Sequence, residues 1–564
     1  MSQSFARIVF AVTAVFFAAF FVWPLCQILK GGFIDADGHL TLAYIGALLS
    51  DPVYLRGLGN SFLLACASTT LTFLIALPLA FLSDRFRFPL KNLLGSVVLL
   101  PMILPPFVGA IGIKQIFGQY GALNALILEL GLRPAGWTYD WFAASPFWGI
   151  AVVNALSLYP IIYLNATAAL ANIDPAMEEA AQNLGCTGWR RFFKITLPLI
   201  QSGLFAGGTI VFIWAFTELG VPLIFDYPRV IAVQIFYGLK DLGGSPAPYA
   251  LVTVMLVSTT VIYIVGKGLF GRQQHAMMAK ATSSGGPREL PRLAAWGCTA
   301  AFAGVTFLAV LPHLGVVLVA FASDWYASVF PQHLTLANFE LALGHPLTVP
   351  AIANSLKFAS LSTLVDLVLG IAIAYVVVRS KLAGRQVLDA LAMLPLAVPG
   401  LVLAFGYLAM SQEGKFFAFL NPIADPTILL IIAYSVRRLP YVVRSAAAGF
   451  QQTSETLEEA AQNLGCPPLK AVFRITLPLI TANLIAGGLL AFAFAMLEVS
   501  DSLILAQKQA FYPITKAILE LFQLLGDGKF MASALGMWAM VFLGVTIVGL
   551  SVILGKKLGA IFRV

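Results

Sequence analysis

The stretch EEAAQNLGCTGWRRFFKITLPLI, residues 178–200, returns later in the chain as EEAAQNLGCPPLKAVFRITLPLI, residues 458–480. The two copies begin 280 positions apart, and long apolar segments flank each of them. Self-similarity over such a length indicates an internal repeat. We therefore expect two equivalent halves, each containing one copy of this stretch.

Each copy predicts a short helix with a cap at both ends. Asp174 or Ser454 can cap its start, and Gly185 or Gly465 permits a left-handed stop. Small and apolar residues recur at i, i+3, i+4 and i+7, which predicts one contact face. That face comprises Met177, Ala180, Ala181 and Leu184 in the first copy and Leu457, Ala460, Ala461 and Leu464 in the second.

A second short helix is predicted to start at Trp189 or Pro468. Proline interrupts the helical hydrogen-bond ladder, so Pro198 or Pro478 should end this helix before the next apolar segment.

The repeated pattern resembles the EAA loop of bacterial ABC importer permeases. It reads Glu-Ala-Ala, three residues, Gly, nine residues, Ile-x-Leu-Pro. It is carried by Glu179, Ala180, Ala181, Gly185, Ile195, Leu197 and Pro198, and again by Glu459, Ala460, Ala461, Gly465, Ile475, Leu477 and Pro478. In that family the loop faces the cytoplasm, and its short helix docks into a groove on the ATP-hydrolysing subunit. The resemblance implies that residues 174–198 and 454–478 dock an ATPase.

Two adjacent glutamates open each copy. Neighbouring residues lie about 100° apart on a helix, and these lie in a loop remote from any cleft, which argues against a catalytic acid/base pair. We interpret Glu179 and Glu459 as contact or loop-bracing groups, and Glu178 and Glu458 as solvated.

The composition is that of a polytopic membrane protein. The 564 residues are 59% hydrophobic and only 11% charged, with a mean hydropathy of +0.89, whereas soluble proteins carry about 25% charged residues. The net charge of +8 comes from residues in short loops beside apolar segments, which favours a role in membrane orientation over nucleic-acid binding. The five cysteines show no metal-ligand spacing, and we expect neither a metal site nor a disulfide framework.

Segments of about 20 apolar residues can cross a bilayer as helices. We predict an all-α protein with twelve spans in two sets of six: residues 8–28, 60–83, 93–116, 146–168, 200–224 and 247–267, then 294–321, 354–378, 388–410, 427–447, 481–505 and 531–554. If the N-terminus is cytoplasmic, 20 Lys and Arg residues lie on the inner side and nine on the outer side. The positive-inside rule then places both termini and both EAA loops in the cytoplasm. The resemblance implies that the membrane is a bacterial inner membrane.

The repeat extends beyond the EAA loops. At an offset of 294, Asn60-Ser61 matches Asn354-Ser355 and Gly112 matches Gly406. We therefore predict a first permease half at residues 1–270, a cytoplasmic linker at 271–293 and a second half at 294–564. Both halves start on the same side, so they should form parallel repeats around an axis along the membrane normal, as in type I ABC importer permeases.

The chain lacks the phosphate-binding loop that ATP hydrolysis requires. None of its four Gly-Lys dipeptides is followed by Ser or Thr. We expect a non-enzymatic transport subunit without a cofactor of its own, and ATP-Mg bound by partner ATPase subunits.

Three acidic residues fall within predicted spans. Glu218 and Glu498 lie 280 positions apart, and Asp501 follows one helical turn after Glu498. A carboxylate in the membrane is costly and usually faces protein or water, so we assign all three to a translocation pathway. The alternative is that the spans end early and leave them at the outer mouth.

Two arginines, Arg437 and Arg438, lie in the tenth span where the first half has Ser157 and Leu158. They could attract an anion or pair with Glu498, which would also place them in the pathway. Alternatively, their side chains extend towards the cytoplasmic surface.

Prolines interrupt the third and ninth spans. They are Pro101, Pro105 and Pro106 in the first half and Pro395 and Pro399 in the second. Such breaks could serve gating or could be fixed bends for packing.

By resemblance the chain is two fused permease halves of an ATP-driven importer. Its partners would be two cytoplasmic ATPase subunits and a periplasmic binding protein, which would dock on outer loops that include residues 29–58 and 323–352. The layout is similar to ferric-iron permeases, and we take ferric iron as the first candidate substrate. Phosphonate, sugar phosphate, thiamine and polyamine remain alternatives, and an ion-coupled secondary transporter is the competing class.

Overall fold

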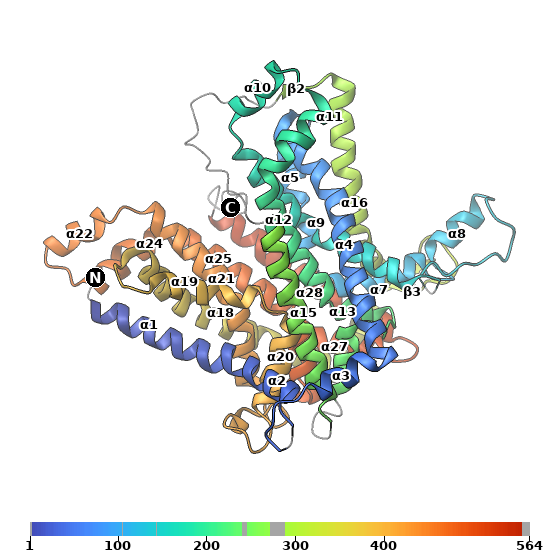
Figure 1. Ribbon diagram of the computed structural model, residues 1–564. Coiled ribbons are helices and arrows are strands. Elements are labelled where there is room, and N and C mark those ends of the chain that lie inside the picture. Colours follow the sequence, from blue (N-terminus) through green and yellow to red (C-terminus); the bar gives the residue numbers. More distant parts are fainter. Residues whose placement is uncertain are drawn as a thin grey trace.

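The computed structural model describes residues 3–35, 37–103, 105–142, 144–239, 245–270 and 288–554. Helices dominate it (Figure 1), which confirms the all-α prediction. The strands are β1 (Phe86–Arg87), which pairs in parallel with β2 (Arg288–Glu289), and β3 (Ala322–Asp324), which pairs antiparallel with β4 (His333–Leu334).

The helices before the predicted linker are α1 (Gln3–Phe17), η1 (Ala18–Val22), α2 (Trp23–Phe33), α3 (Ala43–Ser50), α4 (Pro52–Arg85), α5 (Lys91–Val97), α6 (Leu100–Ile103), α7 (Pro106–Phe117), α8 (Ala122–Glu129), α9 (Pro146–Ala171), α10 (Pro175–Asn183), α11 (Gly188–Arg191), η2 (Phe192–Thr196), α12 (Leu197–Phe216), α13 (Gly220–Ile224), α14 (Ile231–Gly238) and α15 (Ala247–Phe270).

The helices after it are α16 (Arg292–Phe321), α17 (Ala337–Gly344), α18 (Thr348–Arg379), α19 (Arg385–Met393), η4 (Leu394–Leu396), α20 (Gly400–Met410), η5 (Ala418–Leu420), α21 (Thr427–Gln452), α22 (Thr456–Asn463), α23 (Pro468–Ala471), η6 (Val472–Thr476), α24 (Leu477–Leu479), α25 (Thr481–Met496), α26 (Ser500–Leu505), η7 (Gln509–Phe511), α27 (Ile514–Phe522) and α28 (Gly528–Leu554).

The membrane spans agree with the predicted twelve once bent helices are counted as single spans. Among the described residues, eight helices are long and apolar enough to cross a bilayer, and three bent pairs raise that number to 11. The remaining predicted span is α21, a 26-residue helix that carries three arginines. The third and ninth spans bend by 94° and 99° at their prolines, which confirms the predicted breaks.

The halves exchange their first helices. The helices α1 and α2 pack against α18, α19 and α20 of the second half, and α2 also packs against α15 of its own half. Likewise α16 packs against α4, α5, α7 and α9 of the first half and against α28 of its own. Each half thus covers part of the other's opening span.

The repeated glycines Gly112 and Gly406 lie where α7 packs against α16 and where α20 packs against α2. A Cβ on Gly112 would lie 2.0 Å from the Pro312 carbonyl oxygen of α16, and a Cβ on Gly406 would lie 2.9 Å from the Pro24 Cβ of α2. The absent side chain lets each opening span approach closely. This explains why a glycine occurs at both positions.

The repeated Asn-Ser dipeptides anchor equivalent segments. Asn60 donates to the Arg229 carbonyl (2.9 Å), and the Ser61 hydroxyl accepts from the backbone amide at the start of α14 (2.9 Å). Asn354 and Ser355 make the matching bonds to the Ala510 carbonyl (2.9 Å) and to the backbone amide at the start of α27 (2.7 Å). In each half the segment that follows the fifth span is therefore fixed to the second span.

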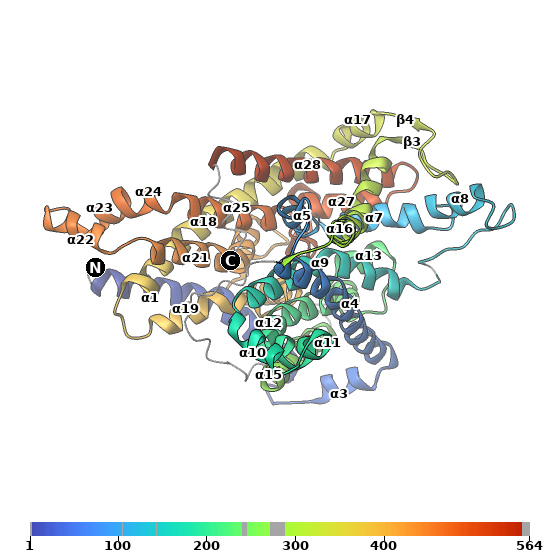
Figure 2. The same cartoon turned by 90° about the horizontal axis from the view of Figure 1, so that it is seen from above.

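The two halves form arms that diverge from a common junction. In Figure 1 the helices α4, α9, α12 and α15 run towards one end, where α10 lies, and α18, α21 and α25 run towards another, where α22 lies. Figure 2 shows the same separation from above. Most of the predicted linker, residues 271–287, lies outside the described residues, so the boundaries of the halves stay a prediction.

The crossing at Gly112 yields a test of the exchanged helices. The change Gly112→Leu should lower the free energy of unfolding by about 1–3 kcal/mol or more, because the new side chain meets backbone atoms that cannot move aside. The matched control is Gly304→Leu on α16, where a Cβ meets nothing within 4 Å. Thermal stability in detergent measures both, and equal stability of the two variants would contradict the packing.

Candidate functional site

The two EAA loops contain the helices α10 and α22, and their predicted caps are largely confirmed. The Asp174 carboxylate accepts from the Ala176 amide (2.9 Å), and Gly185 and Gly465 adopt φ values of +77° and +85°. In the second copy the helix starts later than predicted, because Glu455 occupies the capping position.

The predicted stop at proline is wrong in the first copy. The helix continues from α11 through the π-helical turn η2 into α12, with Pro198 in its first turn. The wider turn accommodates a residue that lacks an amide hydrogen. In the second copy the chain bends by 76° between α24 and α25, after Pro478.

The prediction that Glu178 and Glu458 are solvated is also wrong. Their exposed fractions are 6% and 5%. Glu178 accepts from the Arg85 guanidinium at the end of α4 (2.5 Å) and from the Thr196 hydroxyl (2.9 Å). These contacts brace α10 against the second span.

The second copy repeats this brace. Glu458 accepts from the Thr476 hydroxyl (2.8 Å) and from Tyr375 (3.3 Å), and Arg379 at the end of α18 lies 3.6 Å from it. The carboxylates lie 280 positions apart and the arginines 294, the same offsets as in the repeat. The bracing role predicted for Glu179 and Glu459 is filled by their neighbours, and both residues are exposed.

The opposite side of each EAA helix is apolar and exposed. Met177 and Leu184 are 49% and 87% exposed, and Leu457 and Leu464 are 45% and 90% exposed. Ala180 and Ala460 share these exposed faces, whereas Ala181 is buried and Ala461 is half-buried.

A cavity of about 240 Å³ lies at the junction of the two arms. Both bent spans contribute their prolines, and the polar side chains come from both halves. The polar lining residues are Asn154, Ser157, Thr217, Glu218, Arg437, Arg438, Tyr441, Glu498 and Ser500.

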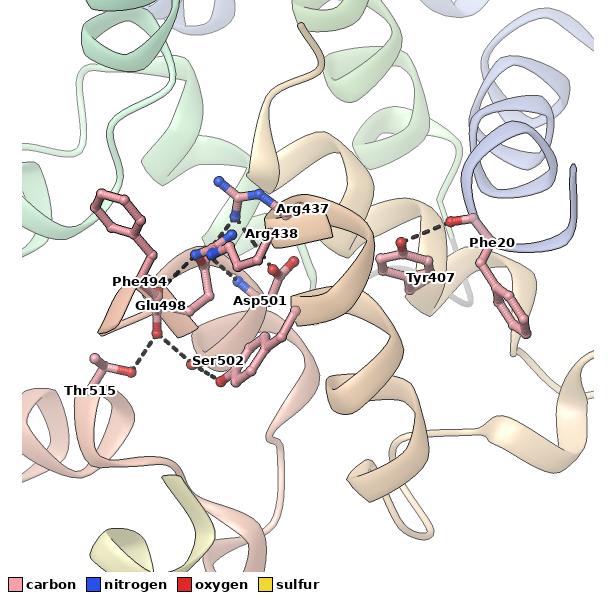
Figure 3. A network of polar contacts seen from close by, with 10 residues as sticks. Phe20, Tyr407, Arg437, Arg438, Phe494, Glu498, Asp501, Ser502 and Thr515 are labelled. Carbon is pink, nitrogen blue, oxygen red and sulfur yellow. Dashed lines mark hydrogen bonds and ion pairs between the residues drawn. The ribbon is translucent and has the colours of Figure 1, made fainter. Parts of the chain in front are cut away.

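The second half supplies an ion-pair network to this cavity (Figure 3). The Arg437 Nη1 lies 2.5 Å from the Glu498 Oε1 and 3.4 Å from the Asp501 Oδ2. Arg438 pairs with the other Glu498 oxygen and donates to the Phe494 carbonyl (2.9 Å). Of the alternatives left open for these arginines, pairing with Glu498 is the one that the structure contains.

Hydrogen bonds hold the backbone of this network. The Glu498 carbonyl accepts from the Ser502 hydroxyl (2.5 Å) and the Thr515 hydroxyl (2.7 Å), and Tyr434 contacts Ser502 (2.6 Å). Sequence reasoning missed these three residues, because a lone hydroxyl in an apolar span carries no signal of its partner.

The first half contributes only Glu218 as a charged residue. Its carboxylate accepts from the Val221 amide (3.1 Å), and among the described residues it forms no ion pair. The positions equivalent to Arg437 and Arg438 hold Ser157 and Leu158. The two walls of the cavity therefore differ in charge.

Within the described part of the chain, one group of His, Cys, Asp or Glu residues is close enough together to hold a metal ion. It consists of Asp35, Asp37 and His39, whose ligand atoms lie within 4.8 Å of one another. The Asp35 carboxylate accepts from the Asp37 and His39 amides, which draws this turn together without an ion.

The brace yields a test with an adjacent control. Replacing Glu178 by Ala removes both hydrogen bonds and leaves Arg85 without this partner, which should cost about 1–3 kcal/mol locally. Amide hydrogen exchange in α10 should then become about tenfold faster or more. Glu179→Ala, on the exposed side, should leave exchange nearly unchanged, and the reverse order of effects would refute the brace.

Comparisons with known proteins place the chain in a family. The model of the binding-protein-dependent transport system inner membrane component matches residues 74–277 and 366–556. A putative ferric transport system permease protein of Haemophilus influenzae is 27% identical over 520 residues, which cover 88% of this chain and 77% of that protein. The ferric transport system permease protein of Actinobacillus pleuropneumoniae is 27% identical, covering 89% and 72%.

A shorter relative matches only part of the chain. The molybdenum transport system permease protein of Escherichia coli K12 is 31% identical over 234 residues, which cover 39% of this chain and 95% of that protein. The family model, by contrast, matches two separate segments of this chain. The chain therefore belongs to the binding-protein-dependent transport system inner membrane components, and it is a multi-pass inner-membrane permease of an ABC importer.

Proposed function

We propose that this chain forms both walls of an ATP-driven import pathway and that α10 and α22 each engage one of two cytoplasmic ATPase subunits. The observation that carries the proposal is the exposure of Met177, Leu184, Leu457 and Leu464 on helices that are braced on their other side. Exposed apolar residues on a braced helix favour a protein partner. ATP-Mg would be bound by those partners.

The docking role implies that both loops and both termini face the cytoplasm. The N-terminal end of α1 lies near α22 at the end of one arm (Figure 1), and the excess of Lys and Arg on the same side supports this orientation. A periplasmic binding protein would then dock on the opposite side, on loops that include residues 29–58 and 323–352. The two permease halves would be residues 1–270 and 294–564.

Ferric iron is the substrate that we propose. Of the two long relatives named above, one is a ferric transport system permease protein and the other a putative one, and among the described residues Glu218 in the cavity has no paired cation. The carboxylates of Glu218 and Glu498 line the cavity with Arg437 and Arg438, and Glu218 is the charged lining residue that lies outside the ion-pair network, which supports a cation as the substrate. Phosphonate, sugar phosphate, thiamine and polyamine remain alternatives with the same machinery.

The docking proposal is tested with charged substitutions on the exposed faces. The double variant Leu184→Glu/Leu464→Glu should abolish co-purification of the ATPase with the tagged chain, because charges would be buried in the contact. Leu525→Glu is the control, since Leu525 is 98% exposed and lies between α27 and α28. Retention of the ATPase by the double variant would argue against docking at these loops.

The energy source and the substrate are tested together by uptake of radioactive ferric iron into proteoliposomes. The chain is reconstituted with its ATPase facing the lumen, and the binding protein is added outside. Uptake should require ATP and should be insensitive to a proton ionophore. Molybdate in place of ferric iron should not be taken up. Uptake that an ionophore abolishes and ATP does not affect would favour an ion-coupled secondary transporter instead.

A further inference from the structure

We propose that α27 holds the outer side of the cavity closed through two lysine–aromatic contacts with the first half, and that both contacts break each time substrate enters. The inference rests on the proposed function, which puts α10 and α22 in the cytoplasm; the outer side is the side of the cavity away from these helices. It assigns a role in the transport cycle to Lys114 and Lys516, neither of which lines the cavity.

On the outer side the two halves meet at buried residues. The helices that follow Glu218 and Glu498 are α13 and α26, and they are buried throughout except for Ser500. A Cβ on Gly220 at the start of α13 would lie 3.3 Å from the Val499 Cγ1 of the second half. Figure 1 shows α13 and α27 at the junction of the arms, away from the ends where α10 and α22 lie. A substrate that arrives from this side therefore has to part the two halves to reach the cavity.

The first contact joins Lys516 of α27 to Phe236 of α14. The Lys516 Nζ lies 5.6 Å from the centroid of the Phe236 ring, and it lies 5.5 Å from the centroid of the Tyr512 ring in its own half. The Lys516 side chain is 11% exposed. A cation within about 6 Å of an aromatic centroid is attracted by the ring, and more strongly where water is excluded. This contact therefore binds the start of α27 to the first half.

The second contact runs in the opposite direction, because its lysine belongs to the first half. The Lys114 Nζ, near the end of α7, lies 5.6 Å from the centroid of the Phe522 ring, and Phe522 is the last residue of α27. Both ends of this nine-residue helix are thus joined to the first half by a cation and a ring.

Each lysine also has a carboxylate partner in its own half. The Lys516 Nζ lies 3.2 Å from the Glu520 Oε1, and the Lys114 Nζ lies 3.3 Å from the Asp226 Oδ2. When the halves part, each lysine loses a ring of the other half but keeps its carboxylate. Opening therefore leaves no unpaired cation behind, which would be costly in a buried place. Such contacts can break and re-form in every cycle.

The equivalent helix of the first half lacks these groups. The Asn-Ser anchors align the start of α14 with the start of α27, 283 positions later, and α7 aligns with α20 at the offset of 294. The equivalent positions in the other half all hold aliphatic residues: Val233 for Lys516, Leu239 for Phe522 and Leu408 for Lys114. The lysines and the ring are therefore not part of the contacts that both halves need for folding, which supports a role that α27 alone carries.

The arms supply the movement that would break the contacts. The helices α10 and α22 lie at the ends of two arms that diverge from the junction (Figure 1). ATPase subunits that close on ATP would draw these ends together. Because the arms are joined at the junction, drawing their ends together pulls the halves apart on the outer side. The helix α27 then separates from α14 and α7.

A crosslink tests whether the contact opens. In the full complex, with the five native cysteines replaced by alanine, a short thiol-reactive crosslinker should join the pair Phe236→Cys and Lys516→Cys in the absence of nucleotide. The yield should fall several-fold when ATP and vanadate hold the ATPase closed. The control pair is Asn354→Cys and Ala510→Cys within the second half, where the Asn354 Nδ2 lies 2.9 Å from the Ala510 carbonyl oxygen, and it should crosslink equally in both states. A yield for the first pair that ATP and vanadate do not change would overturn the inference.

Removing the charge of Lys516 tests whether the contact holds the resting state. Lys516→Met keeps the apolar stem, and ATP hydrolysis without the binding protein should rise about three- to tenfold, because the lost cation–π contact shifts the halves towards the open state by that factor. Lys516→Arg keeps a cation and should stay near the unaltered rate. Lys357→Met is the matched control, since the Lys357 Nζ lies 5.7 Å from the ring centroid of Phe358, its neighbour in the same helix. Its rate should be unchanged.

A double-mutant cycle assigns the effect to the pair. Phe236→Leu should raise the same rate of ATP hydrolysis, and combining it with Lys516→Met should raise the rate no further than Lys516→Met alone. Multiplied effects, or no rise in either single variant, would overturn the inference and leave the proposed function intact if the unaltered complex takes up substrate with ATP. An unaltered complex without any ATP-dependent uptake would refute the proposed function, and the inference with it.

Discussion

A charged group that is buried in this protein is stabilised by a partner within the chain, because burial removes the water that would otherwise solvate the charge. The loop braces and the cavity network both follow from this constraint. In each brace an arginine at the end of a span meets a buried glutamate of a cytoplasmic-type loop, and in the network Arg437 and Arg438 share the two oxygens of Glu498. Pairing therefore fixes how the loops sit on the spans and how α21 sits against the α25–α26 turn.

The two halves share the contacts that hold their helices together, but they differ in the charged residues that they contribute to the cavity. The braces, the Asn-Ser anchors and the crossing glycines occur in both halves at matching positions. These features hold the helices in place and are needed twice. Among the described residues the ion-pair network of the cavity lies in the second half only, so one wall of the cavity carries most of the charged side chains. Fusion of both halves in one chain allows the two walls to differ in this way.

Local features of the sequence were predictable because their causes lie within a few residues. Span length, proline breaks, the Asp174 cap and the left-handed glycines all depend on neighbours in the chain. The burial of Glu178 depends on Arg85, 93 residues earlier, and no local pattern announces that partner. The continuation of the helix through Pro198 depends on a wider π turn, which the proline alone does not specify. The exchange of first helices was equally invisible, since an apolar span packs as well against one neighbour as another.

That exchange sets the order in which the chain can complete its fold. The helices α1 and α2 leave the ribosome well before α18, α19 and α20, which cover part of their surface and begin more than 300 residues later. During synthesis α2 can meet α15 of its own half, but the side that faces the second half must stay uncovered in the lipid until those helices are made. The first half receives its missing helix only when α16 is inserted. Neither half contains all the surfaces that cover its own first helix, and a chain released midway would leave α1 partly uncovered and the place of α16 in the first half unfilled.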